Sequence, residues 1–228
     1  MIVFLNIFVK DVIKMIKRDL LKEIENGLKI VTDTVNEGIL NNDTKEAFEI
    51  INNKMKEMVG VDIDTVNTVS FDTIKNMINV GFENNTDKYI AFGMLLKLQG
   101  YLYKQEGDIS KEIFYYLVSI SAFNEGFTCD DTYLDNYKDH IIEIIGELQK
   151  YELSIEESKE VFISYELIGK YDKAEDVLYE MINKSQDKES IKKLGIDFYN
   201  RLLEKSEDDL VKGNLSMDEV HEGLKDLM

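Results

Sequence analysis

Apolar side chains recur every three or four positions through the first 40 residues of the chain. Over residues 4–40 this spacing predicts one long amphipathic helix. The apolar positions are Phe8, Val12, Ile16, Leu20, Ile24, Leu28 and Val31.

A second pattern, in Lys88–Gln105, places apolar residues at nearly every angle of a helical wheel. A helix that is apolar all round is normally buried on several sides. The stretch is too short and too rich in lysine to span a membrane. Gly93 and Gly100 lie seven residues apart and so share a helix face, where a neighbouring element can come close. We expect this stretch to be the central helix of an all-helical domain.

Short polar turns separate the remaining apolar segments. Further helices are expected at 44–59, 70–80, 110–124, from Asp130 or Asp131 onward, and at 154–169, 172–184 and 188–205, with short helices after Ser206 and Ser216. Ser154 with Glu157, and Ser216 with Glu219, have the spacing of capping boxes. The alternating Val, Ile and Thr of residues 61–69 suit either a short strand or a loop, and we favour a loop or a single turn.

About ten helices result, and their short connections favour antiparallel neighbours. We interpret residues 1–228 as a single domain. It would consist of a long N-terminal helix (1–40), degenerate helical repeats (41–186) and a C-terminal helical cap (187–228).

Three helix–turn–helix units share a turn register, with a small or apolar residue early in each second helix: Ala47, Ile113 and Ala174. The third, Tyr165-x-x-x-Gly169-x-Tyr171-x-x-Ala174, resembles a tetratricopeptide (TPR) repeat. The second is similar but has one extra residue: Gly100-x-x-Tyr103, Gly107-Asp108 and then Ile113. Anchor spacings of 66 and 61 residues exceed the roughly 34 of that repeat. The resemblance implies a TPR-like antiparallel array, a right-handed α-α superhelix, with an unrelated helical bundle as the alternative.

The C-terminal region carries a second resemblance. Its motifs are Phe198-Tyr199-x-x-Leu202-Leu203, Asp208 or Asp209 with Leu210, Gly213-x-Leu215, and Glu219-Val220-x-Glu222-Gly223-Leu224. These resemble an uncharacterised Firmicute protein family of about this length. That resemblance implies a TPR-like helical fold and supplies no catalytic residues.

The formal net charge is −18, from 45 acidic and 27 basic side chains. Residues 1–22 carry a balance of +3, which leaves −21 on the rest of the chain. This acidity argues against nucleic-acid binding, since phosphate backbones are bound by Lys and Arg. It favours basic partners. Cys129 is the single cysteine, which excludes an intrachain disulfide framework and suits the reducing cytoplasm.

The N-terminus begins with nine apolar-rich residues that have neither a preceding basic region nor a following cleavage site, so we do not expect a signal peptide. The stripe Leu5, Phe8, Val12, Ile16 and Leu20 should be helical and buried against the first repeat or, in a homodimer, against a second copy. Docking on an anionic membrane is the alternative that we disfavour, because the acidic body would be repelled.

Candidate chemistry is sparse. His140 and His221 each have glutamates nearby, but a metal site needs several ligands that converge. The acidic run Asp130, Asp131, Asp135 and Asp139 lacks the glycine and spacing of a calcium loop, and we interpret it as a solvated face. No phosphate-binding loop or nucleophile elbow is present. We therefore assign no catalytic, cofactor or metal-binding residues.

The favoured function is a non-enzymatic protein–protein interaction module or scaffold whose partner is a basic or helical peptide. The groove is expected on the first helices of the repeats, at Lys97, Tyr101, Lys104, Glu160 and Tyr165. The alternative is a small-molecule-binding or enzymatic helical domain with a pocket between helices.

Overall fold

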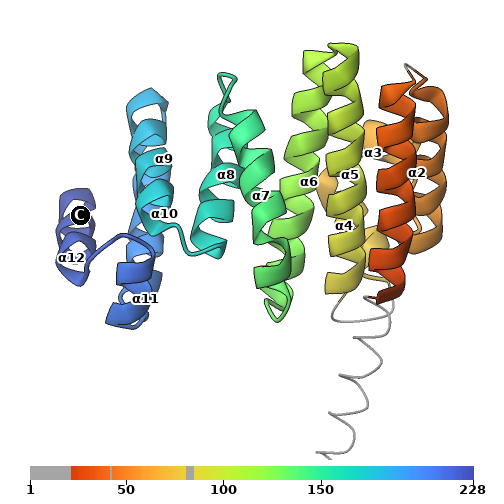
Figure 1. Ribbon diagram of the computed structural model, residues 1–228. Coiled ribbons are helices and arrows are strands. Elements are labelled where there is room, and N and C mark those ends of the chain that lie inside the picture. The colour runs from red at the N-terminus through yellow and green to blue at the C-terminus, as the bar shows by residue number, and fades with distance from the viewer. Residues whose placement is uncertain (1–21, 42, 81–84) are drawn as a thin grey trace, which may run out of the picture. The chain divides into compact units, whose positions relative to one another are not determined.

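The computed structural model describes residues 22–41, 43–80 and 85–228 (Figure 1). Contacts between α-carbons divide the chain after Asp131 into two compact units. We call the described residues up to Asp131 unit 1, and Thr132–Met228 unit 2. All regular structure in the described residues is helical, which confirms the all-α class. The prediction of one domain over the whole chain stays a prediction.

Unit 1 begins with a helical segment over 22–40, whose buried side chains Ile24, Leu28, Val31 and Val35 keep the predicted period. Positions 4–21 of the predicted helix, including the stripe Leu5 to Leu20, lie outside the described residues. The helices that follow are α2 (Lys45–Met58), α3 (Ile63–Thr68), α4 (Phe71–Ile78), α5 (Thr86–Glu106) and α6 (Ile109–Cys129).

The central position predicted for Lys88–Gln105 is confirmed, since α5 packs against both α2 and α6. Contact with these two helices explains why α5 is apolar on all sides.

The two glycines of α5 lie where α6 comes closest. A Cβ atom on Gly93 would lie 2.9 Å from the ring of Phe123, and one on Gly100 would lie 2.8 Å from the ring of Tyr116. The two glycines therefore allow α6 to approach closely, as their spacing indicated.

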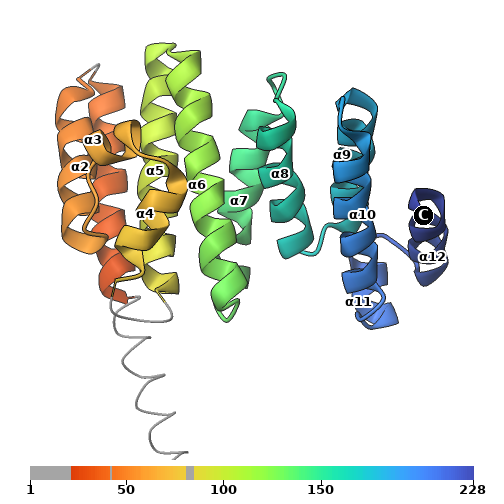
Figure 2. The ribbon, with the colours of Figure 1, turned by 180° about the vertical axis from the view of Figure 1, so that it is seen from behind.

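Two short helices, α3 and α4, occupy the segment after α2, and Figure 2 shows them from the side on which they lie over unit 1. The Asp62 side chain caps α3 by accepting the Thr65 N–H at 2.8 Å. Ser70 likewise caps α4. Residues 61–69 thus form a short helix with flanking turns, close to the single turn that we favoured. No strand occurs there.

Unit 2 contains α7 (Leu134–Leu148), α8 (Ile155–Leu167), α9 (Tyr171–Lys184), α10 (Lys188–Leu202), α11 (Glu207–Lys212) and α12 (Met217–Leu227). Both predicted capping boxes form, at Ser154 with Glu157 and at Ser216 with Glu219. Two predicted boundaries were wrong. α6 continues past Asn124 to Cys129, because Phe127 adds another buried side chain, and α7 starts only at Leu134.

Successive helices of unit 2 pack together, with α9 against α8 and α10, and α10 against α12. Phe162 and Phe198 meet edge to face with ring centroids 5.2 Å apart. Arg201 of α10 donates two hydrogen bonds to the carboxylate of Glu166 on α8, each 2.7 Å long. Both contacts join α8 to α10, between residues 35 or 36 positions apart in sequence.

Two of the predicted repeats share one turn geometry. Gly107 and Gly169 adopt left-handed backbone, with φ values of +74° and +72°. Each glycine, and the residue after it, donates its N–H back to the preceding helix in the Schellman pattern. The bonds are Gly107 to Lys104 (3.2 Å), Asp108 to Tyr103 (3.0 Å), Gly169 to Glu166 (3.1 Å) and Lys170 to Tyr165 (2.8 Å).

Aligned on these glycines, the next helix begins two residues later in both repeats. Ala174, which is fully buried, then corresponds to Glu112, which is 2% exposed, and not to Ile113. The prediction of one extra residue in the second repeat is therefore wrong, because the turns after Gly107 and Gly169 have equal length. In the first repeat Ala47 does mark a close approach, 3.4 Å from a Cβ atom built on Gly38.

Candidate functional site

An open cleft of about 700 Å³ lies in unit 2. Three elements border it: α7, the turn between α8 and α9, and the region of α11. Its lining residues are Asp135, Lys138, Asp139, Ile142, Ile168, Gly169, Lys170, Tyr171, Lys205, Asp209 and Lys212.

The α7 side of the cleft follows from helical spacing. Asp135, Lys138, Asp139 and Ile142 stand three or four residues apart, which places them on one face of the helix. The other face of α7 carries Tyr137, Ile141, Ile144, Ile145 and Leu148, all buried. Because the apolar face is buried, the charged face is the one left to line the cleft.

The α8–α9 turn contributes Lys170 because Gly169 ends α8 in the left-handed conformation. Lys170 is the N-cap residue of α9, and its side chain makes no cap hydrogen bond. Tyr171, the next residue, is only 7% exposed. Burial raises the pKa of its phenol, and the nearby carboxylates of Asp209 and Glu166 raise it further.

The third side of the cleft is tied to the start of α9. The Asp172 N–H donates to the Gly213 carbonyl at 3.1 Å, and the Asn214 amide donates to the Asp172 carboxylate at 3.1 Å. A Cβ atom on Gly213 would lie 2.2 Å from the Tyr171 ring, so only glycine allows this approach. These contacts fix the position of Lys205, Asp209 and Lys212 relative to the turn.

Charge is distributed unevenly between the sides of the cleft. On the α7 side, Lys138 bonds to Asp135 at 2.9 Å, and Asp139 adds a second carboxylate. We call Asp135 and Asp139 the acidic side. Hydrogen bonding to Asp135 and the fields of both aspartates raise the pKa of Lys138.

The other two elements that line the cleft contribute Lys170, Lys205 and Lys212 and a single carboxylate, Asp209. We call these three lysines the basic side. Lys212 lies 3.7 Å from Asp209, whereas Lys170 and Lys205 form no ion pair with any described residue. A hydrogen bond from Ser206 lowers the pKa of Asp209, and the charges of Lys212 and Lys205 lower it further.

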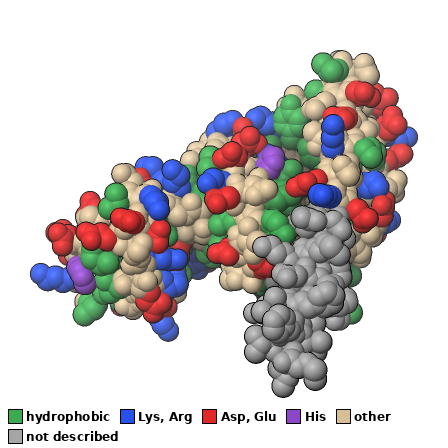
Figure 3. Space-filling model, turned by 60° about the horizontal axis from the view of Figure 1, so that its bottom comes forward, with side chains coloured by type: hydrophobic (Ala, Val, Ile, Leu, Met, Phe, Trp, Pro, Cys, Tyr) green, Lys and Arg blue, Asp and Glu red, His purple; other side chains and the backbone are tan. Residues whose placement is uncertain are grey.

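The cleft also has an apolar strip formed by Ile142, Ile168 and Tyr171. Ile142 is 40% exposed, so part of its apolar surface remains accessible in the cleft. A cavity with apolar surface and a few charged groups can hold a ligand and also orient it. Figure 3 shows basic and acidic side chains interspersed on one face of the molecule.

The residues predicted to form a groove fall in both units. Lys97, Tyr101 and Lys104 share one face of α5 in unit 1, and each is half-buried. Glu160 and Tyr165 lie on α8 in unit 2, where Tyr165 is 9% exposed and burial raises the pKa of its phenol. None of the five lines the cleft, and their role in binding stays a prediction.

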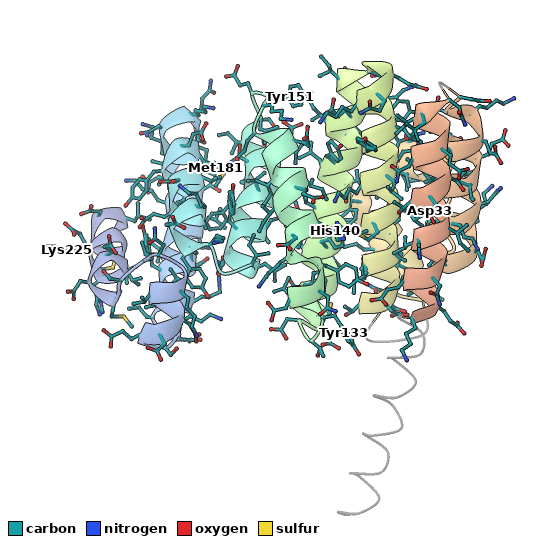
Figure 4. The ribbon with its side chains drawn as sticks, in the orientation of Figure 1. Asp33, Tyr133, His140, Tyr151, Met181 and Lys225 are labelled. Carbon is teal, nitrogen blue, oxygen red and sulfur yellow. The ribbon has the colours of Figure 1, made fainter. Side chains whose placement is uncertain are left out.

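The two histidines lie apart from each other in sequence and environment. His140 is half-buried on α7 (Figure 4), with Nδ1 3.9 Å from a carboxylate oxygen of Glu143. His221 is exposed on α12. Within the described ranges, no three His, Cys, Asp or Glu side chains come together in a way that could hold a metal ion.

Cys129 is exposed at the end of α6. Partial burial of the sulfur and the neighbouring charge of Glu125 raise the pKa of its thiol. A raised pKa lowers the fraction of reactive thiolate, so the environment does not activate this cysteine. Across 22–41, 43–80 and 85–228, no helix is long and apolar enough to cross a bilayer.

The sequence pattern predicts a solvated acidic face that includes Asp135 and Asp139, and it does not single out the lysines of the cleft. One available signal was the repeat of charged residues at 135, 138 and 139 followed by an apolar residue at 142. No local signal connects Lys170 with Lys205, because only the packing of α11 against α9 brings them to one cavity.

Comparison with known proteins gives a family but no activity. No curated protein and no solved structure matches the chain. A family model does match, over residues 8–228, which is nearly the full length. The chain belongs to this family, described as a family of unknown function (DUF6483).

Proposed function

We propose that the protein is a non-enzymatic protein–protein interaction module, and that the cleft of unit 2 binds a segment of its partner. The observation that carries this proposal is the open cleft of about 700 Å³, which is lined by both apolar and charged side chains. A short peptide would cover Ile142 and the accessible part of Ile168 while its polar groups remain in contact with Asp, Lys and water.

The same proposal extends to the arrangement of the helices, the charge of the partner, and the source and location of the protein. We propose a TPR-like arrangement of the helices, supported by the matching Schellman turns at Gly107 and Gly169. The net charge of −18 supports a partner that is basic overall, since opposite charge speeds association. A Firmicute source and a cytoplasmic location complete the proposal, the latter because the chain has a single cysteine.

A second candidate is a small-molecule site in the same cleft. The volume of about 700 Å³ favours it, because it lies within the range of roughly 300–1,000 Å³ typical of ligand pockets. We place it second because the cleft is open and its charged groups are spread along two sides, which suits an extended ligand better than a compact one.

The test is selection of peptides from a random display library on the full chain, followed by hydrogen–deuterium exchange of the complex. We expect the bound peptide to protect the backbone amides of residues 135–142, 168–171 and 205–212. Protection confined to unit 1, or failure to select any peptide, would contradict the proposed function.

A matched pair of variants checks the site. Ile142→Trp should fill the cleft and weaken peptide binding at least tenfold. Ile163→Trp is the control, since Ile163 has a similar exposure of 37% against 40%, lies on α8 and does not line the cleft. Equal loss of binding in both variants would mean that the tryptophan acts through the fold and not through the cleft.

A further inference from the structure

We propose that the cleft selects a segment bearing both signs of charge, with an acidic group on the side of Lys170, Lys205 and Lys212 and a basic group on the side of Asp135 and Asp139. This inference rests on the proposed function and specifies the ligand class of the same site.

The charge of the cleft differs from the charge around it. Thr132–Met228 holds 13 basic and 24 acidic side chains, yet the cleft is lined by four lysines and three aspartates. A random sample of this surface would be dominated by carboxylates. The cleft therefore gathers lysines in a strongly acidic unit, and an acidic group has reason to bind here.

The two sides differ in sign. On α7, Asp135 and Lys138 form an ion pair and neutralise each other, so Asp139 carries the remaining charge of the acidic side. On the other two elements, Asp209 and Lys212 neutralise each other, so Lys170 and Lys205 carry the remaining charge of the basic side.

Lys170 and Lys205 make no ion pair with any part of the chain that the structure describes, so an incoming carboxylate does not have to displace one. The side chains available to a ligand are thus negative on the acidic side, at Asp139, and positive on the basic side, at Lys170 and Lys205.

The position of these charges is set by the fold. Asp139 is fixed by the face that α7 presents, and Lys170 by the left-handed turn at Gly169. Lys205 precedes α11, which the backbone bond from Asp172 to Gly213 holds against the start of α9. Because charges on ordered elements need little rearrangement on binding, they can favour one orientation of a ligand over its reverse.

A segment with separated charges suits both the lysines of the cleft and the negative net charge of the whole chain. The field of a protein of net charge −18 attracts basic chains and repels acidic ones. A purely acidic peptide would be opposed by that field, and a purely basic one by the lysines of the cleft. A segment whose basic part meets Asp135 and Asp139 and whose acidic part meets the lysines avoids both penalties.

The experiment measures binding of four capped octapeptides to the full chain by fluorescence anisotropy. One carries two glutamates at one end and two lysines at the other, and the others are its all-glutamate, all-lysine and uncharged counterparts. We expect the peptide of mixed charge to bind at least about tenfold more tightly than each of the others. Its affinity should fall as salt is added.

Reversing the charge of two lysines tests whether the basic side of the cleft binds the acidic end of the peptide. Lys170→Glu with Lys205→Glu should weaken the mixed peptide at least tenfold and strengthen the all-lysine peptide. Lys188→Glu with Lys193→Glu changes the net charge equally at exposed positions of α10 outside the cleft, and should change affinity less than twofold. Circular dichroism checks that each variant is folded, and Lys170→Gln with Lys205→Gln provides a milder second test.

Neutralising the other side should have the opposite effect. Asp135→Asn with Asp139→Asn should move the preference toward the all-glutamate peptide, whereas Glu222→Gln with Asp226→Asn, exposed on α12, should not. Peptide binding that protects the cleft but ignores both sets of variants would overturn this inference and leave the proposed function intact. Absence of cleft protection with all four peptides and with the display library would overturn the proposed function itself.

Discussion

Gly100 of α5 lies directly against the ring of Tyr116 on α6, so that a Cβ atom added at Gly100 would come within 2.8 Å of Cδ1. Tyr116 is only 3% exposed, so its ring is surrounded by other protein atoms. The same relationship recurs seven residues earlier between Gly93 and Phe123, at 2.9 Å. Two small positions on α5 thus receive two aromatic rings from α6, and this fixes how closely the helices pack.

The first prediction concerns Gly100→Ala. Alanine favours the helix by about 1 kcal/mol relative to glycine, but overpacking against a buried ring costs roughly 1–3 kcal/mol. We expect the overpacking cost to exceed the helix preference, so that the free energy of unfolding falls by about 1 kcal/mol. Urea unfolding followed by circular dichroism measures it.

Gly146→Ala is the matched comparison. Gly146 also lies inside a helix, α7, but a Cβ atom there would meet nothing within 4 Å. With no steric cost, this variant should gain about 0.5–1 kcal/mol. An increase of similar size in Gly100→Ala would show that Tyr116 yields to the added methyl group.

Much of the fold could be predicted because its signals are local. The uniform hydrophobicity of Lys88–Gln105 indicated a helix with neighbours on several sides, and Gly93 and Gly100 indicated where one of them approaches. Both capping boxes form, since each depends only on residues three apart. The expected end of α6 at residue 124 was wrong, although a glycine such as Gly126 is typical of the position just after a helix. Gly126 is instead buried, and a Cβ atom there would lie 2.7 Å from Cβ of Tyr89.

The candidate site could not be predicted for a physical reason. Its acidic side belongs to one helix and has a visible spacing, but its basic side combines Lys170 from a turn with Lys205 and Lys212 from a region some 35 residues later. Tertiary contacts bring those segments together: the backbone bond from Asp172 to Gly213, the Asn214–Asp172 hydrogen bond and the packing of Gly213 on the Tyr171 ring. Sequence patterns with a period of two or 3.6 residues carry no information about such a pairing.

The second prediction concerns Arg201 and Glu166, whose two parallel hydrogen bonds join α10 to α8. Lysine keeps the charge but not the planar fork that matches a carboxylate. Because the Arg201 side chain is 48% exposed, water screens the pair and its contribution is small. Arg201→Lys should lower the free energy of unfolding by about 0.5–1 kcal/mol.

The comparison for this pair is Lys184→Ala, which removes an ion pair within α9 to Glu180, four residues away. Pairs of this spacing contribute about 0.2–0.5 kcal/mol. Chemical denaturation of both variants should therefore rank Arg201→Lys as the more damaging. The reverse order would mean that the bidentate bond between helices adds little to the stability of unit 2.

The third prediction concerns Ser216, which begins α12 by accepting the Glu219 N–H while the Glu219 carboxylate accepts the Ser216 N–H at 2.7 Å. Ser216→Ala removes the hydroxyl half of this box and should cost about 1 kcal/mol. Ser216→Asp supplies another capping carboxylate and should retain most of the stability. Hydrogen exchange of the α12 amides is the direct measurement, because loss of a cap frays the helix that it precedes.

The last prediction concerns Glu175, whose carboxylate accepts a 2.6 Å hydrogen bond from the Tyr199 hydroxyl at the packing of α9 against α10. Burial raises the pKa of Glu175 above its ordinary value of 4.5, and the charges of Glu219, Asp176 and Asp172 add to this, although the Tyr199 bond opposes it. The unfolded chain therefore loses this proton at a lower pH than the folded chain does. Between the two pKa values the folded state binds more protons, so the contribution of Glu175 to stability falls as pH rises.

Glu175→Gln keeps an oxygen acceptor for Tyr199 but does not titrate. Its free energy of unfolding, relative to the parent chain, should be constant below about pH 4. It should rise in favour of the variant between the unfolded and the folded pKa of Glu175, and level off above the folded pKa. Thermal unfolding from pH 4 to pH 8 measures the difference. Glu180→Gln, at an exposed carboxylate of the same helix, makes the same change in net charge. A parallel rise in that control would assign the effect to the total charge of −18 and not to the buried bond between Glu175 and Tyr199.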